Sequence, residues 1–230
     1  MTPVEGGSLA DHAARRVREH IRAHDLKVGD PLPGEGWFAT DLGVSRAVIR
    51  EAFGALAALR LIDVANGRRA RVGAIDGSVM GTSIEHAVVT AQISVAEVWD
   101  VRRTLEMRTA ELAACHRTAA DADEIAREAD AMVAAGDALQ QVTQHDILFH
   151  QAIARASGNT LFRQTIRSFE PLMTIAVPVA WRTRVTPEQR RDILRTHQQI
   201  ADAIHRSDPA AAVQAMDSHF IASISELLHR

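Results

Sequence analysis

The chain has 230 residues and a mass of 25.1 kDa, which suits two modest domains or one large one. Hydrophobic residues make up 47% and charged residues 24%, and no apolar run approaches the roughly 18 residues of a membrane span. These values exclude a membrane-spanning protein. Aromatic residues are only 4% of the chain while alanines number 40, a composition that favours helices over a β-rich fold.

Two features of the sequence predict a cytoplasmic protein without a membrane partner. Residues 1–7 lack the basic segment and the apolar stretch that a secretory signal requires. Cys115 is the single cysteine, so the chain cannot form an internal disulfide of the kind that stabilises secreted domains.

Charge is distributed unevenly along the chain, although the net charge is only −3. Residues 1–75 carry 11 basic and 9 acidic side chains, whereas residues 76–230 carry 15 basic and 20 acidic ones. Within residues 45–71, six arginines occur with only two acidic residues. We expect an anionic partner to bind at this local excess of positive charge.

The N-terminal part predicts three helices followed by a β-hairpin. A loop rich in glycine and proline, over residues 27–34, separates the first helix from the second. Gly43 ends the second helix, because glycine adopts the left-handed conformation at the lowest cost, and Ser45 can cap the third. Asn66-Gly67 is typical of a tight hairpin turn. The predicted elements are helices over Ser8–His24, Glu35–Leu42 and Ser45–Leu59, and strands over Leu61–Val64 and Ala70–Val72.

The rest of the chain predicts helices with short connections, as in an antiparallel bundle. Three glycines within Gly73–Gly81 mark the boundary before it. The expected helices cover Ser94–Thr118, Asp121–Ala138, Val142–Ala156, Thr160–Val179, Pro187–His205 and Pro209–Leu228, with a further short helix near Ser83–Ala91. We therefore expect an N-terminal domain over residues 1–74, a linker over 75–92 and an all-α domain of six or seven helices over 93–230.

The layout around Gly43 is that of a helix-turn-helix, in which the N-terminal residues of the second helix enter the major groove of DNA. Arg46 and Arg50 lie one turn apart on that helix and could each bind a guanine edge or a phosphate. The hairpin would then be a wing that brings three more arginines to the DNA: Arg68, Arg69 and Arg71. The alternative is a packing motif with arginines on a solvated face.

An ordered set of motifs runs through this region: Asp25-Leu26-Lys27-Val28-Gly29-Asp30-Pro31-Leu32-Pro33, Asp41-Leu42-Gly43-Val44-Ser45-Arg46, Val48-Ile49-Arg50-Glu51-Ala52, and Leu56 through Leu61-Ile62. The set resembles the winged helix-turn-helix of the GntR family of bacterial transcription regulators, over about residues 9–72. By this resemblance Arg46 and Arg50 match the recognition-helix arginines and Gly67 matches the glycine at the wing tip. The residues expected to bind DNA are Ser45, Arg46, Arg50, Gly67, Arg68 and Arg69.

The sequence departs from the family pattern at three places. Gly34-Glu35-Gly36 stands where the family usually has Ser-Glu-Arg, whose arginine contacts DNA. Ala47 replaces a polar residue, and the wing reads Gly67-Arg68-Arg69-Ala70-Arg71 in place of Gly-Arg-Gly-Thr. These departures imply that some phosphate affinity has moved from the second helix to the wing.

Four residues of the C-terminal part are candidates for a metal site. Asp146 and His150 are spaced i, i+4 and so share one helix face. His197 and His219 each lie among apolar residues at helical spacing, which points both into the bundle. Buried imidazoles need partners, and one divalent cation would satisfy all four groups. The alternatives are a surface Asp–His pair and histidines that are hydrogen-bonded within the core.

Arg102 interrupts an apolar row on the helix expected from Ser94, in which Val95, Val98, Leu105, Thr109 and Leu112 recur at helical spacing. One interpretation is a salt bridge to Glu106, one turn further on. The other is that the guanidinium binds a carboxylate ligand, which its planar geometry suits.

The second half carries its own motifs: Val101-Arg102-Arg103-Thr104-Leu105-Glu106, Asp146-Ile147-Leu148-Phe149-His150, Ala156-Ser157-Gly158-Asn159, and Thr196-His197-Gln198-Gln199-Ile200 through Met216 to His219. They resemble the all-helical effector domain, FCD, of the FadR-type GntR subgroup over about residues 94–228. Many members hold a divalent metal with one Asp and three His and bind a small carboxylate beside it. The matching residues are Asp146, His150, His197 and His219 for the metal, with Arg102 matching the family arginine. Thr196 replaces a common glutamate, which implies altered contacts around the metal site.

The sequence therefore predicts a ligand-responsive transcription regulator, most often a repressor in this family, that binds palindromic operator DNA as a homodimer. Zn²⁺ or Ni²⁺ suits the histidine-rich site, and the carboxylate also admits Mn²⁺. A metal-dependent enzyme with an Asp/His₃ centre is the alternative, although the sequence offers it no positioned general base or nucleophile. Such an enzyme would not need the first 75 residues.

Overall fold

The computed structural model of the chain describes residues 7–227. The chain divides into two compact units, Met1–Val79 and Met80–Arg230. Residues 1–6 lie outside the described range, and most of the prediction about a secretory signal rests on them. Leu228, the predicted end of the last helix, also lies outside it.

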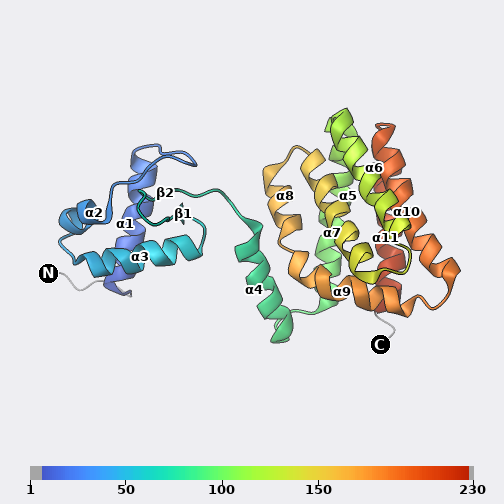
Figure 1. Ribbon diagram of the computed structural model, residues 1–230, viewed down its shortest axis with the longest axis horizontal. Helices are drawn as coiled ribbons and strands as arrows, with labels where there is room; N and C mark the ends of the chain where they lie inside the picture. The colour runs from blue at the N-terminus through green and yellow to red at the C-terminus, as the bar shows by residue number, and fades with distance from the viewer. Residues whose placement is uncertain (1–6, 228–230) are drawn as a thin grey trace. The chain divides into compact units, whose positions relative to one another are not determined.

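The first unit contains three helices and a short hairpin (Figure 1). Its core takes residues from all three helices, since Val17, Phe38 and Ile49 are each at most 1% exposed. This shared core holds the second helix against the third. The elements are α1 (Leu9–Ala23), α2 (Glu35–Leu42), α3 (Arg46–Ala58), β1 (Ile62–Asp63) and β2 (Arg71–Val72).

The connection between α2 and α3 forms the turn of a helix-turn-helix. Gly43 closes α2 in the left-handed conformation with φ 65°. The Ser45 hydroxyl accepts a hydrogen bond from the Val48 amide at 3.3 Å and so caps α3. The N-terminal end of α3 therefore presents its first residues, among them Arg46 and Arg50, to solvent.

The wing is shorter than the predicted strands. β1 and β2 pair antiparallel, with Ile62 opposite Val72 and Asp63 opposite Arg71. The predicted turn is present, because the Arg68 amide donates to the Ala65 carbonyl at 3.2 Å around Gly67, whose φ is 72°. The other edge of β2 is paired with the loop before α2, where the Ala70 carbonyl accepts from the Leu32 amide at 2.8 Å.

The second unit is an antiparallel helical bundle. Figure 1 shows the long helices α5, α6, α7, α10 and α11 alongside one another, with α9 running across them. Phe149, Ile153, Ile200, Ile204 and Met216 are fully buried between these helices. α4 (Gly77–Val89) begins in the first unit and continues into the second. The other elements are α5 (Val95–His116), α6 (Ala119–Ala135), α7 (Leu139–Ala156), α8 (Thr160–Arg167), α9 (Glu170–Thr183), α10 (Pro187–His205) and α11 (Pro209–Leu227).

Two helix predictions differ from the structure by more than three residues at one end. The single helix expected over 160–179 is broken into α8 and α9, because Pro171 has no amide to continue the ladder and opens α9 instead. α9 then continues past Pro178 to Thr183, where Ala180 and Trp181 are buried. The short helix expected from Ser83 begins at Gly77, after the Asp76 carboxylate accepts from the Ser78 amide at 3.0 Å.

The predicted fold class is confirmed: a winged helix-turn-helix precedes an all-helical unit, and the two-stranded hairpin is the only sheet among the described residues. Along residues 7–227, none of the helices combines the length and the hydropathy that a membrane crossing requires.

Candidate DNA-binding surface and candidate metal centre

The two arginines of α3 lie exposed on its N-terminal half. Arg50 is held loosely, since its Nε lies 3.6 Å from a carboxylate oxygen of Glu35 and its side chain is 69% exposed. Arg46 lies against the first turn of α2, where its guanidinium passes over Gly36. The residues expected to read DNA are therefore on one surface, with Ser45 acting as the cap of α3.

The wing arginines divide into two groups. Arg68 and Arg69 are exposed around the turn at Gly67. Arg71, which the sequence analysis also placed on the wing, uses its Nη1 to donate to the Gly29 carbonyl at 2.6 Å. Arg71 thus holds the wing to the loop before α2, leaving Arg68 and Arg69 as its outward cations.

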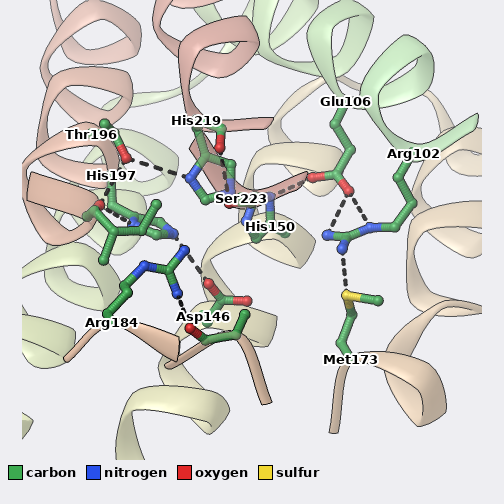
Figure 2. A network of polar contacts seen from close by, with 12 residues as sticks. Arg102, Glu106, Asp146, His150, Met173, Arg184, Thr196, His197, His219 and Ser223 are labelled. Atoms are coloured by element: carbon green, nitrogen blue, oxygen red, sulfur yellow. Dashed lines mark hydrogen bonds and ion pairs between the residues drawn. The ribbon is translucent and has the colours of Figure 1, made fainter. Parts of the chain in front are cut away.

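Three helices bring three buried histidines together in the second unit. His150 on α7, His197 on α10 and His219 on α11 are each at most 5% exposed. One ring nitrogen of each lies within 4.8 Å of the others (Figure 2). Nitrogen atoms of three imidazoles at this separation are a suitable donor set for a divalent transition metal.

In each histidine Nδ1 has a partner outside the cluster. His197 Nδ1 donates to the Ile193 carbonyl at 2.8 Å, and His219 Nδ1 faces the Thr196 hydroxyl at 3.4 Å. His150 Nδ1 forms a close ion pair with Glu106. A metal-bound histidine usually uses its second nitrogen in this way, which fixes the ring and leaves Nε2 for the ion. Thr196, the residue that departs from the family pattern, thus contacts a candidate ligand.

Asp146 adds a carboxylate to the cluster. Its Oδ1 lies 3.2 Å from His197 Nε2. His197 Nδ1 already donates to the Ile193 carbonyl, so Nε2 is the ring nitrogen that faces this carboxylate. Burial opposes ionisation of Asp146, but the His197 contact and nearby positive charges lower its pKa to about 2. The residues present therefore fit a divalent ion.

His219 is poised in the form that binds metal. Burial lowers its pKa well below 6.5, and electrostatic interactions with His197 and His150 lower it further. The ring is consequently neutral near pH 7, which leaves its Nε2 lone pair available.

The salt bridge that was one of two interpretations of Arg102 is present. Its Nε and Nη2 both lie 2.8 Å from Oε1 of Glu106, and the two side chains are 4% and 1% exposed. Arg102 also contacts Met173 Sδ and lies over the Trp99 ring, 4.9 Å from its centroid. A continuous chain of polar contacts, Arg102–Glu106–His150, therefore joins α5 to α7 (Figure 2).

A cavity of about 40 Å³ opens beside the histidines. Asp146, the three histidines and Arg102 all contribute to its wall. Sequence reasoning missed Arg184, a buried arginine that also lines the cavity and donates to the Ala180 carbonyl at 2.8 Å. Arg184 follows the predicted end of its helix, so no periodicity marked it. The role of Glu106 beside His150 had no signal either, since the two are 44 residues apart in the sequence.

Comparisons with known proteins agree with this architecture. Residues 9–72 match the gntR family of bacterial regulatory proteins, and residues 97–222 match the FCD domain. The chain is 32% identical over 227 residues to the Glc operon transcriptional activator of Escherichia coli K12, covering 96% of this chain and 89% of that protein. It is 27% identical over 215 residues to the transcriptional regulator LutR of Bacillus subtilis, covering 90% and 95%.

Further similarity comes from a repressor and from solved structures. NanR of E. coli K12, strain DH10B, is 26% identical over 232 residues, covering 99% of this chain and 87% of that one. The fold matches a GntR protein of Streptococcus agalactiae with a TM-score of 0.66 at 24% identity, covering 94% of this chain and 99% of that one. It matches McbR/YncC of E. coli with a TM-score of 0.52 at 18% identity, covering 97% and 99%.

A winged helix-turn-helix followed by an FCD effector domain defines a DNA-binding transcription regulator. The chain belongs to the GntR family. Its relatives are regulators and not enzymes, so the alternative of a metal-dependent enzyme is set aside.

The buried pair on α5 yields a stability prediction. Arg102→Met leaves the Glu106 carboxylate buried beside an apolar chain, which should lower the free energy of unfolding by about 3–5 kcal/mol. The double variant Arg102→Met/Glu106→Gln removes the unpaired charge and should recover part of this loss. Urea unfolding of the full-length protein measures both, and equal stability of wild type and Arg102→Met would contradict the prediction.

Proposed function

We propose that the chain is an effector-responsive regulator whose C-terminal unit holds a divalent metal and a small carboxylate, and whose affinity for operator DNA changes when that carboxylate binds. The observation that carries the proposal is that three buried histidines each place one ring nitrogen within 4.8 Å of the others, while each Nδ1 has a partner outside the cluster. Buried polar atoms without a bonding partner destabilise a protein, and a bound cation would supply a partner to these nitrogens.

Asp146, His150, His197 and His219 would hold the ion. The ligand set suits Zn²⁺ or Ni²⁺, and the carboxylate also admits Mn²⁺. Once bound, the ion supplies a positive centre to which a carboxylate oxygen can bind. The chain itself orients the ligands: Ile193, Thr196 and Glu106 fix the rings through Nδ1.

The effector site is proposed beside the ion. The cavity of about 40 Å³ admits only a small molecule, and its wall includes Arg102 and Arg184. Guanidinium groups pair with carboxylates in a planar, two-point geometry. Arg102 is already paired with Glu106, so its contribution is a positioned positive charge at the wall. A small carboxylate that binds two arrangements of the protein unequally would shift operator affinity, typically by about 1–3 kcal/mol.

DNA binding is proposed for α3 and the wing. Arg46 and Arg50 would read base edges in the major groove, and Arg68 and Arg69 would bind phosphates beside Gly67. The direction of control that we predict is repression. One relative is named a transcriptional activator of the Glc operon, and another, NanR, is named a transcriptional repressor. Direction depends on where the operator lies relative to the promoter, which in vitro transcription with and without the regulator measures.

We predict a homodimer. Regulators of this family bind operator DNA and usually dimerise. A single helix-turn-helix makes few base contacts, and two-fold symmetry matches a palindromic operator. Light scattering should give twice the chain mass of 25.1 kDa at micromolar concentration. A monomer both with and without DNA would contradict the prediction.

Alanine substitution of an α3 arginine and of a wing arginine should reduce DNA affinity in different ways. The probe is a duplex that the wild-type protein selects from a random pool, compared with a random-sequence duplex of equal length. Arg50→Ala should weaken binding by about 1–3 kcal/mol on the selected duplex and little on the random one. Arg68→Ala should weaken both and reduce the salt dependence. Arg127→Ala, which removes the same charge at an exposed position of α6, is the control. Equal losses of affinity on both duplexes for Arg50→Ala would disprove the role of Arg50 in discrimination.

The metal proposal is tested by metal analysis of protein purified without chelator or His-tag. His197→Ala should lose the ion, whereas His205→Ala, an exposed histidine on the same helix, should keep it. Arg102→Lys, which keeps a charge beside Glu106, should retain metal and DNA binding but weaken the response to small carboxylates, because the flexible ammonium does not hold the fixed position of the guanidinium. A wild-type site that stays empty and ignores added Zn²⁺, Ni²⁺ and Mn²⁺ would reduce the cluster to a buried polar network.

A further inference from the structure

We infer that the indole N–H of Trp99 binds the effector, donating a hydrogen bond to a carboxylate oxygen that enters the cavity beside the histidines. The inference rests on the proposed effector site and adds to it a contact that neither the metal ion nor the arginines supply. Trp99 lies on α5, one turn before Arg102, and is 5% exposed.

The N–H of Trp99 is a buried donor without an acceptor. Within residues 7–227, no protein atom accepts a hydrogen bond from its Nε1. Glu106 Oε2 and His150 Nδ1 are also buried without a hydrogen bond, but these two atoms form the close ion pair with each other. An indole nitrogen can only donate, so an acceptor is the one partner that satisfies it. Its burial without that partner destabilises the ligand-free protein.

The two groups that pack against the indole hold the ring but offer it no acceptor. The Arg102 guanidinium lies over the ring, with Cζ 4.9 Å from the ring centroid, and carries donors only. The Phe220 ring lies 6.5 Å from the indole, centroid to centroid, at an interplanar angle of 67°. Neither neighbour presents an oxygen to Nε1. A donor beside a guanidinium is instead a suitable place for an anion.

Trp99 contributes to the wall of the cavity in which the effector is proposed to bind. A carboxylate has two oxygens, so one can bind the metal ion while the other accepts from the indole. A hydrogen bond to an ionised acceptor is stronger than one between neutral groups. Nε1 is inaccessible to water in this structure, and the bond therefore requires the indole to turn toward the cavity when the oxygen enters. A ligand with a methyl or ammonium group at that point would leave the N–H unpaired and bind less tightly.

The unpaired N–H also gives a reason for the ligand to change the protein. A ligand shifts the balance between two arrangements only when it binds one of them more tightly. An acceptor in the cavity would pair Nε1 in the turned arrangement of the indole and not in the ligand-free one. Because the ring contacts Arg102 on α5 and Phe220 on α11, its turn would alter the packing between these two helices.

The direct test follows the indole proton by NMR in the full-length protein loaded with Zn²⁺. The chain has three tryptophans, so labelling tryptophan with ¹⁵N gives three indole signals, which Trp37→Phe and Trp181→Phe assign. Titration with acetate or formate should move the Trp99 Hε1 signal downfield, because a proton that gains an anionic acceptor is deshielded. The signal of Trp37, which lies in the first unit, should stay in place. Calorimetry of the same titration measures binding independently of the indole.

A matched pair of variants tests the contribution of the N–H to affinity. Trp99→Phe removes the donor but keeps an aromatic ring beside Arg102, and it should weaken acetate binding about tenfold while retaining Zn²⁺. Trp181→Phe makes the same change in the wall of the same cavity, where the N–H is not a buried unpaired donor, and should give a smaller loss. The thermal midpoint of ligand-free Trp99→Phe should stay near that of wild type, because loss of an unpaired buried donor offsets the lost contact area.

The possible outcomes separate this inference from the proposed function. The inference is overturned if acetate or formate binds but the Trp99 Hε1 signal does not move downfield. It is also overturned if Trp99→Phe weakens binding no more than Trp181→Phe does, since the effect would then come from cavity shape. If Trp99→Phe fails to fold, the wild-type NMR titration decides alone. If neither anion binds to the Zn²⁺-loaded wild type, the proposed effector site fails together with the inference that rests on it.

Discussion

The candidate metal centre depends on the contacts that hold three buried imidazoles from outside, through Nδ1. A carbonyl of α10, a hydroxyl of the same helix and a carboxylate of α5 supply these contacts to His197, His219 and His150. These contacts fix the three rings, and one ring nitrogen of each lies within 4.8 Å of the others. The orientation of the cluster is therefore a property of the helix packing, and any change in the spacing of α5, α7, α10 and α11 alters it.

Charged groups inside the bundle are also stabilised by contacts with neighbouring helices. Glu106 can stay ionised at 1% exposure because Arg102 and His150 both lie against it, and together they lower its pKa despite the opposing effect of burial. Arg102 is itself enclosed by the Trp99 and Phe220 rings and by Met173. This enclosure leaves a small cavity, where the proposed effector would have to be a compact anion.

The two units use arginine in opposite ways. In the second unit Arg102 is buried and paired, and its charge contributes to the structure of the site. In the first unit Arg46 and Arg50 are exposed and only loosely held by the first turn of α2, as suits side chains that exchange water for DNA. Arg71 belongs to neither group, because its bond to the Gly29 carbonyl makes it a tie between the wing and the preceding loop.

Helical periodicity and turn residues in the sequence determined the fold class, the helix-turn-helix at Gly43-Val44 and the inward direction of His197 and His219, because these features depend on neighbours within a few positions. The break between α8 and α9 had a local cause in Pro171, but the continuation past Pro178 depended on burial of Trp181. Only the tertiary structure decided that Glu106 joins Arg102 to His150, that Arg184 lines the cavity and that Arg46 lies over Gly36. Each of these contacts joins residues from different helices, and their meeting is set by packing, which no local sequence pattern encodes.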